Sequence, residues 1–194
     1  AIIEKTGGID ILVNNAGISQ RARVVDTEMH VIDRVMQVNF YGAVAMTKAV
    51  LPQMIARGNG HIVVISSLVG KFGTPLRSAY AASKHALHGF FDALRAETFN
   101  QGIQVTTFCP GYIKTELSYH AMMGDGTTNN QLDKGQANGM AADVFAKKAL
   151  KAISAGKKEV VIGGKETLGI YFKRFFPNWF FNYVTRINVK DGGR

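Results

Sequence analysis

The chain has 194 residues, which suits one domain with a sizeable hydrophobic core. Hydrophobic residues make up 46% of the sequence and charged residues 19%, and there is no apolar run of about 18 residues that could form a membrane-spanning helix. The single cysteine, Cys109, excludes a disulfide within these residues, and the net charge of +9 is scattered, so we expect no nucleic-acid partner.

Residues 1–5 have the pattern of a helix end, and no methionine precedes them. We therefore expect the C-terminal portion of a longer protein, folded as a single domain over residues 1–194. Beyond residue 5, four short β-branched runs predict strands buried on both faces of a parallel sheet, at residues 9–13, 62–65, 105–108 and 160–162. The stretches between them predict helices near residues 28–56, 79–99 and 141–155, the last ending at Gly156.

This alternation of strands and helices predicts an α/β fold with a doubly wound parallel sheet, in which ligands bind beyond the carboxyl ends of the strands. Two segments depart from the alternation. Residues 112–139 are polar and too long for a routine connection, so we expect a lid or binding loop. Residues 165–194 form a tail in which eight aromatic side chains are interleaved with six lysines or arginines.

The aromatic tail admits two interpretations. Its rings can cover a pocket or build a subunit interface, which is the interpretation that we favour. Rings interleaved with cations also suit the headgroup depth of a membrane surface. Pro177 and the shortness of the apolar runs argue against a spanning helix, but they leave association with a membrane surface open.

Tyr80 and Lys84 stand four residues apart, so on a helix they share one face. A free tyrosine has a pKa of about 10 and is a poor proton-transfer group at neutral pH. One ammonium at ~4 Å supplies about 4 kcal/mol at an effective dielectric constant near 20, enough to lower that pKa by about three. Taken alone, the pair also fits a solvated helix face, so its interpretation depends on the residues around it.

Further polar residues follow the predicted strands. Ser67 ends the second strand, thirteen residues before Tyr80, where a hydroxyl can stabilise negative charge on a carbonyl oxygen or cap a turn. Asn39 lies inside a predicted helix, where asparagine is unfavourable unless its amide has a specific partner. The first strand ends in Asn-Asn-Ala-Gly at residues 14–17, and the third is followed by Pro-Gly-Tyr-Ile-Lys-Thr at residues 110–115.

In their order and spacing, these motifs resemble the classical short-chain dehydrogenase/reductase family, from residue 1 to about Ile162. Residues 71–73 and 77–86 are also similar to the DHRS7-like branch. The resemblance implies a Rossmann-like sheet that lacks the first three strands of the family fold, and with them the glycine-rich loop TGxxxGxG. Lys5-Thr6-Gly7-Gly8 does not replace that loop, because it precedes a strand. These residues therefore do not indicate whether the cofactor is NAD or NADP.

The resemblance implies an oxidoreductase that transfers a hydride between NAD or NADP and an alcohol or carbonyl substrate, with residues 112–139 as its substrate loop. Tyr80 would be the general acid or base, and Lys84 would lower its pKa and hold the nicotinamide ribose. Ser67 would polarise the carbonyl, and Asn39 would bind a water that completes a proton relay. Asn14 would stabilise the sheet. The implied cofactor site comprises Asn15, Ala16, Gly17, Tyr80, Lys84, Pro110, Gly111, Ile113 and Thr115.

The resemblance also implies a homodimer or homotetramer built on the helices that carry Asn39 and Tyr80. We expect a cytoplasmic protein and an apolar substrate. We expect no metal, because no further metal ligands accompany the histidines and Cys109 has the position of a core residue. A non-catalytic scaffold that lacks the phosphate loop is the alternative from another class. An epimerase of the extended branch shares YxxxK, but the Pro-Gly-Tyr-Ile-Lys-Thr element favours the classical branch.

Overall fold

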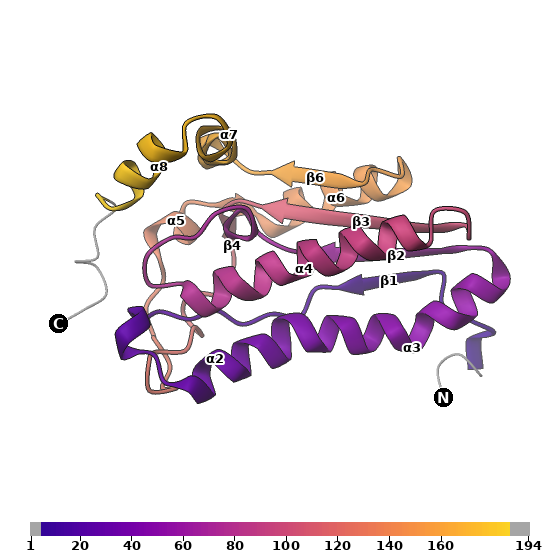
Figure 1. Ribbon diagram of the computed structural model, residues 1–194, viewed down its shortest axis with the longest axis horizontal. Coiled ribbons are helices and arrows are strands. Elements are labelled where there is room, and N and C mark those ends of the chain that lie inside the picture. The colour runs from indigo at the N-terminus through magenta and orange to yellow at the C-terminus, as the bar shows by residue number, and fades with distance from the viewer. Residues whose placement is uncertain (1–4, 187–194) are drawn as a thin grey trace.

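The computed structural model describes residues 5–186, which form a four-stranded parallel sheet between two layers of helices (Figure 1). The strands are β1 (Ile11–Asn14), β2 (Gly60–Ile65), β3 (Ile103–Pro110) and β6 (Glu159–Ile162), in the order β1-β2-β3-β6. All neighbouring strands are parallel. The predicted doubly wound sheet is confirmed. Each predicted strand matches an observed strand, and their ends differ by at most two residues.

Central strand β2 explains why the apolar runs are continuous rather than alternating. Its side chains point to both faces of the sheet, and both faces are covered by helices. Ile62 and Val64 pack with Leu87 and Phe91 on one face, while Val63 packs with Phe108 on the other. At the sheet edge, β1 pairs only with β2 among the described strands, and its Ile11 and Val13 are about half exposed, at 51% and 50%.

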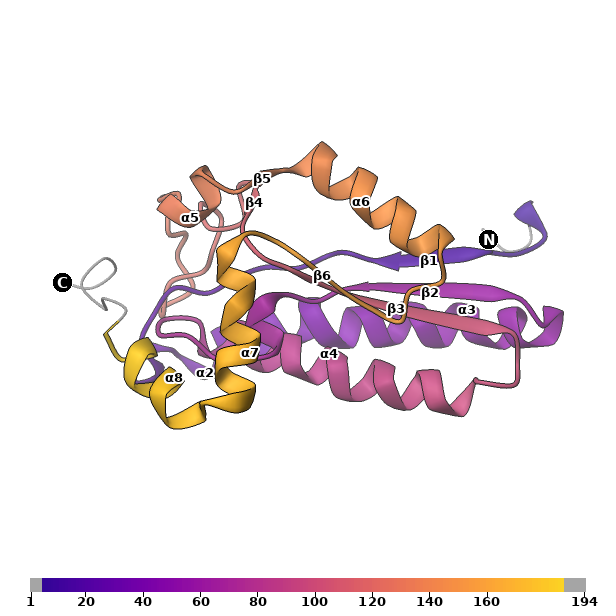
Figure 2. The same cartoon turned by 90° about the horizontal axis from the view of Figure 1, so that it is seen from above.

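The helices α2 (Met29–Met36), α3 (Gly42–Arg57) and α4 (Ser78–Glu97) cover one face, and α6 (Ala142–Ser154) covers the other (Figure 2). The stretch predicted as one helix over residues 28–56 is continuous but contains a π-helical turn, η2 (Gln37–Tyr41), between α2 and α3. Such turns often occur at functional sites, and Asn39 lies inside this one. As predicted, α6 is followed by Gly156, in the left-handed region with φ of +61°.

The segment predicted as a long loop, residues 112–139, contains short elements of its own. These are β4 (Ile113–Lys114) and α5 (Lys134–Ala137), and β4 pairs with β5 (Met140–Ala141), just beyond the segment. The Ser118 amide donates to Gln136 Oε1 at 2.8 Å, which ties one end of the segment to the other. Short 3-10 turns also occur at η1 (Val24–Asp26) and η3 (Leu68–Gly70).

The tail folds back beyond the carboxyl ends of the strands as η4 (Lys165–Thr167), α7 (Leu168–Phe175) and α8 (Pro177–Val184) (Figure 1). Phe180 packs on Phe72, with ring centroids 5.1 Å apart. Within residues 5–186, no helix is long and apolar enough to cross a membrane. Residues 1–4, which we expected to end a helix, and residues 187–194 of the predicted tail lie outside the described residues.

Candidate active site

Tyr80 and Lys84 lie in the first half of α4, facing the carboxyl end of β2. Only 8% of Tyr80 and 3% of Lys84 is exposed, so the pair is not a solvated helix face. Lys84 Nζ donates a hydrogen bond to the Ile65 carbonyl oxygen at 2.8 Å and lies 5.7 Å from the centre of the Tyr80 ring. Burial lowers the pKa of the Lys84 ammonium to about 8.

Ser67 follows β2 and begins η3, where its hydroxyl accepts a hydrogen bond from the Val69 amide at 3.4 Å. It also interacts with the Tyr80 phenol. Burial raises the pKa of Tyr80, while the hydrogen bond with Ser67 and the charges of Arg77 and Arg21 act in the opposite direction. The sequence predicts that Lys84 lowers the pKa of Tyr80, but the cations that act on it here are Arg77 and Arg21, which were not predicted.

Asn39 holds three segments together from inside the π-helical turn. Its Oδ1 accepts from the Ile18 amide at 2.8 Å, and its Nδ2 donates to the Ile18 carbonyl at 2.9 Å. Nδ2 also donates to Ser83 Oγ at 2.9 Å. These partners explain why a helix tolerates an asparagine here. The amide is committed to protein groups, and a bound water at Asn39 stays a prediction.

The loop after β1 approaches Lys84 closely. Asn14 Nδ2 donates to Thr47 Oγ1 at 3.0 Å in the interior, which ties β1 to α3. A Cβ added at Gly17 would lie 3.4 Å from both Asn39 Oδ1 and Lys84 Nζ. The missing side chain at Gly17 therefore keeps open the space in front of the Lys84 ammonium.

One cavity of about 540 Å³ gathers most of the residues predicted to hold the cofactor. Eight of the nine line it, namely Asn15, Gly17, Tyr80, Lys84, Pro110, Gly111, Ile113 and Thr115. Ala16 is the exception, with its residue exposed at the surface. The sequence motifs that follow three different strands thus meet in one place, as the parallel sheet predicts.

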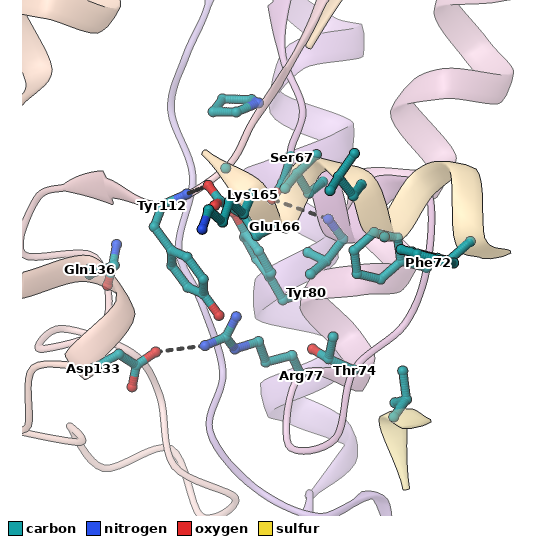
Figure 3. Close-up of a pocket in the computed structure, with 18 of the residues that line it drawn as sticks. Ser67, Phe72, Thr74, Arg77, Tyr80, Tyr112, Asp133, Gln136, Lys165 and Glu166 are labelled. Carbon is teal, nitrogen blue, oxygen red and sulfur yellow. Dashed lines mark hydrogen bonds and ion pairs between the residues drawn. The ribbon is translucent and has the colours of Figure 1, made fainter. Parts of the chain in front are cut away.

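A second cavity of about 510 Å³ adjoins the first (Figure 3). Ser67 and Tyr80 are among the six residues that line both, so the two cavities meet around these side chains. The walls of the second cavity are mostly apolar and are formed by Leu68, Phe72, Leu117, Phe172, Trp179 and Phe180. The tail therefore lines a pocket, which is the first of the two interpretations that the sequence allowed.

The polar corner of the second cavity contains an ion-pair network that no sequence motif predicted. Arg77 Nη2 pairs with Asp133 Oδ2 at 2.7 Å, and Arg21 pairs with the same carboxylate (Figure 3 shows Arg77 and Asp133). Burial acts to raise the pKa of Asp133, but the hydrogen bonds and charges of the two guanidinium groups outweigh it and hold the pKa below its usual value. The network joins the 112–139 segment to the start of α4.

Glu166 fastens the tail to the loop after β3. Its Oε1 accepts hydrogen bonds from the Tyr112 amide at 3.2 Å and from the Gly164 amide at 2.9 Å. A Cβ at Gly111 would come within 2.1 Å of the same oxygen, so a larger residue there would displace the Glu166 carboxylate. The sequence placed Gly111 in the cofactor site but did not identify its contact with Glu166.

Three side chains outside the cavities lie together between α4 and the sheet. The sequence had predicted no further metal-ligating residues near the histidines. Ligand atoms of His88, Cys109 and Glu159 lie within 4.8 Å of one another. Lys71 Nζ pairs with Glu159 at 2.6 Å and opposes a second cation there. Burial lowers the pKa of His88 to about 4 and raises that of the Cys109 thiol to about 12, so both groups are neutral packing residues near pH 7.

Comparison with known proteins agrees with this geometry. A family model described as short chain dehydrogenase matches residues 1–123. Dehydrogenase/reductase SDR family member 7B of Xenopus tropicalis is 46% identical over 191 residues, which cover 98% of this chain and 62% of that protein. The Danio rerio protein of the same name is 42% identical over 194 residues, covering 100% and 63%. The chain thus spans less than two thirds of these relatives.

Solved structures with a similar fold include dehydrogenases with bound cofactors. A gluconate 5-dehydrogenase from Burkholderia cenocepacia, in complex with NADP and tartrate, is 38% identical with a TM-score of 0.59, over 60% of this chain and 46% of that one. A 4-hydroxyisoleucine dehydrogenase complexed with NADH and succinate is 26% identical with a TM-score of 0.68, over 84% and 70%. This chain belongs to the short-chain dehydrogenase family, in its DHRS7-like branch.

Proposed function

We propose that the complete protein is an oxidoreductase that transfers a hydride between NAD or NADP and an alcohol or carbonyl carbon. The observation that carries this proposal is the position of Ser67 and Tyr80 where the two cavities meet. A reacting carbon at that junction has a cofactor-sized space on one side and an apolar space on the other. The NADP and NADH bound by two proteins of similar fold support the cofactor class.

The chain's own residues fit the nicotinamide end of such a cofactor. Asn15, Gly17 and Lys84 line the cavity from the β1 side, and Ile113 and Thr115 line it from the β3 side. Gly17 leaves room in front of the Lys84 ammonium for ribose hydroxyls. When bound there, the cofactor supplies or accepts the hydride.

The proton moves through Tyr80. In carbonyl reduction, the Tyr80 hydroxyl donates its proton to the carbonyl oxygen as negative charge develops there, and the Ser67 hydroxyl stabilises the same oxygen. Burial raises the pKa of Tyr80, which keeps the phenol in its acid form and suits proton donation. In alcohol oxidation, Tyr80 acts as the base, and this requires its pKa to fall. The positive charges of Arg77 and Arg21 act in that direction.

The second cavity indicates an apolar substrate. Phe72, Phe172 and Phe180 line the wall away from Ser67, and the charges in its polar corner are already paired with one another. A ketone or alcohol with an extended apolar body fits such a wall. The 112–139 segment supplies Asp133 and Gln136 to the same cavity, which supports its role as a substrate loop.

The full-length Tyr80→Phe variant tests the proposal. The variant keeps the ring and loses the proton, so we expect cofactor affinity to stay within about twofold and turnover of apolar ketones to fall by at least about 100-fold. Cofactor binding is measured by titration and turnover by cofactor oxidation. Near-normal turnover in the variant would refute the role of Tyr80. A full-length protein that binds neither NAD(H) nor NADP(H) would favour the non-catalytic scaffold.

A further inference from the structure

The two tail helices carry many large apolar side chains that are exposed. The aromatic hairpin, as we call residues 168–184, has eight large apolar side chains that are 41–68% exposed: Leu168, Tyr171, Phe172, Phe175, Phe176, Trp179, Phe181 and Tyr183. Four of them, Leu168, Phe172, Trp179 and Tyr183, also line the second cavity, where Trp179 lies 5.1 Å from Phe172 and stacks on Tyr183 at 5.7 Å, measured between centroids. The other four, Tyr171, Phe175, Phe176 and Phe181, are exposed and line neither cavity. A cluster of exposed apolar side chains of this kind marks an interaction site.

The hairpin is attached to the domain by its inner side. Phe180, only 4% exposed, packs on Phe72 and Leu68. Lys173 Nζ donates to the Lys71 carbonyl at 2.7 Å. These contacts hold α7 and α8 against the domain, beyond the ends of the strands (Figure 2).

The charges around the hairpin are almost all positive. Between residues 165 and 186 the chain has four basic residues and one acidic residue. Lys165, Arg174 and Arg186 are exposed. The one acid, Glu166, uses its carboxylate oxygen to accept backbone hydrogen bonds from Tyr112 and Gly164. Exposed aromatic rings flanked by cations are complementary to a bilayer that carries anionic headgroups.

The shape of the hairpin fits the bilayer interface rather than its interior. Each helix has eight residues and is therefore about 12 Å long, far short of a hydrocarbon core of about 30 Å. Two short helices with exposed rings can lie flat at headgroup depth, where tryptophan and tyrosine are enriched.

Two other occupants fit less well. A second copy on a two-fold axis would place Arg174 and Arg186 among the same cations of its partner, which is unfavourable for like charges. Further strands of the family fold, added to this sheet, would pair with the free edge of β1. Strand β6 forms the opposite edge of the sheet. The hairpin follows β6, so such strands would leave it uncovered (Figure 1).

We propose that the aromatic hairpin docks on the surface of a bilayer containing anionic lipids. The inner sides of the same helices line the second cavity through Gly169, Phe172 and Tyr183. Docking therefore places the hydrocarbon phase beside the apolar cavity. This relation to the cavity rests on the proposed function, but the docking itself does not.

Hydrogen–deuterium exchange of the full-length protein locates the contact directly, even if another segment also binds lipid. With vesicles of phosphatidylcholine and phosphatidylserine, we expect slower exchange in peptides that cover residues 168–184 and a smaller effect with phosphatidylcholine alone. Unchanged exchange in these peptides would overturn the proposal. Protection that appears without vesicles and grows with protein concentration would identify a second copy instead.

Matched variants separate docking from folding. Phe175 and Phe181 are exposed and do not line either cavity. We expect the double change Phe175→Ser and Phe181→Ser to weaken binding to the mixed vesicles by about tenfold or more. The control, Phe99→Ser, removes a ring that is 74% exposed just beyond the end of α4 and should leave binding unchanged. Equal loss in the control and the double variant would also contradict the proposal.

A second pair of variants tests whether positive charge contributes to vesicle binding. Arg174→Gln should weaken binding to the mixed vesicles about fivefold, whereas Lys151→Gln on α6 should have no effect. Binding of both variants at the level of the unchanged protein would remove the electrostatic part of the proposal. Vesicle binding involves no turnover, so its failure leaves the proposed reaction standing. Loss of turnover in Tyr80→Phe leaves the docking proposal standing in turn.

Discussion

Asn39 Nδ2 donates a hydrogen bond to Ser83 Oγ at 2.9 Å, and Ser83 Oγ in turn donates to the Tyr80 carbonyl at 2.8 Å. The π-helical turn is thereby joined to the backbone of the helix that carries Tyr80 and Lys84. The same asparagine is bonded to both backbone groups of Ile18, in the loop that lines the first cavity. Asn39 thus sets the distance between the loop after β1 and α4.

We predict that Asn39→Ala destabilises the protein and disorganises this junction. The change removes the acceptor of the Ile18 amide and the donor to Ser83 Oγ, which keeps only its bond to the Tyr80 carbonyl. A group left unsatisfied costs about 1–3 kcal/mol of unfolding free energy. Denaturant unfolding of the full-length protein measures the loss. Asn59→Ala, at an exposed asparagine before β2, should cost less than about 0.5 kcal/mol. Equal stability of the two variants would contradict the assignment.

Lys84 gives a pH-dependent prediction. Burial lowers its pKa from 10.5 to about 8, so between these values the unfolded chain binds a proton that the folded chain has released. The stability of the cofactor-free protein, relative to Lys84→Met, should therefore rise as the pH increases from about 8 to about 10.5. The penalty for a buried ammonium is fully present below that window. Unfolding free energies of both proteins across the range test this. A constant difference would show that Lys84 is not buried as a charged group.

How much of the site the sequence predicts depends on the range of the interaction. Strand β2 and the pair Tyr80 and Lys84 carry their signal within a few residues, as hydrophobic runs or as side chains on one helix face. The Arg21–Asp133 pair joins residues 112 positions apart, and no local sequence pattern predicts it. Only the fold brings the loop after β1 to the 112–139 segment.

The tail shows the same limit. Its aromatic residues were evident from the sequence, but which of them are buried was not. Phe180 and Phe181 are adjacent in the chain, yet one is packed on Phe72 and the other is exposed. The difference comes from the direction in which α8 crosses the end of the sheet. Periodicity within eight residues is too short to determine that direction.

Arg77 offers the sharpest test of how Tyr80 is tuned. Its positive charge lowers the pKa of Tyr80, so Arg77→Gln should raise that pKa further above 10. The base form of Tyr80 then requires a higher pH, and the rising limb of kcat/KM for alcohol oxidation should move toward alkaline pH. The acid form persists to higher pH, so the falling limb for carbonyl reduction should move the same way.

The control for this prediction is Arg34→Gln, which removes the same charge from an exposed position on α2. It matches the change in net charge but lies outside both cavities. A structural role of Arg77 alone would lower the rate through the loss of its bond to Asp133 and leave the pH limbs in place. Displaced limbs in Arg77→Gln, with unmoved limbs in Arg34→Gln, would assign the effect to the guanidinium charge beside Tyr80. Shifts of equal size in both would instead assign it to the overall charge of the protein.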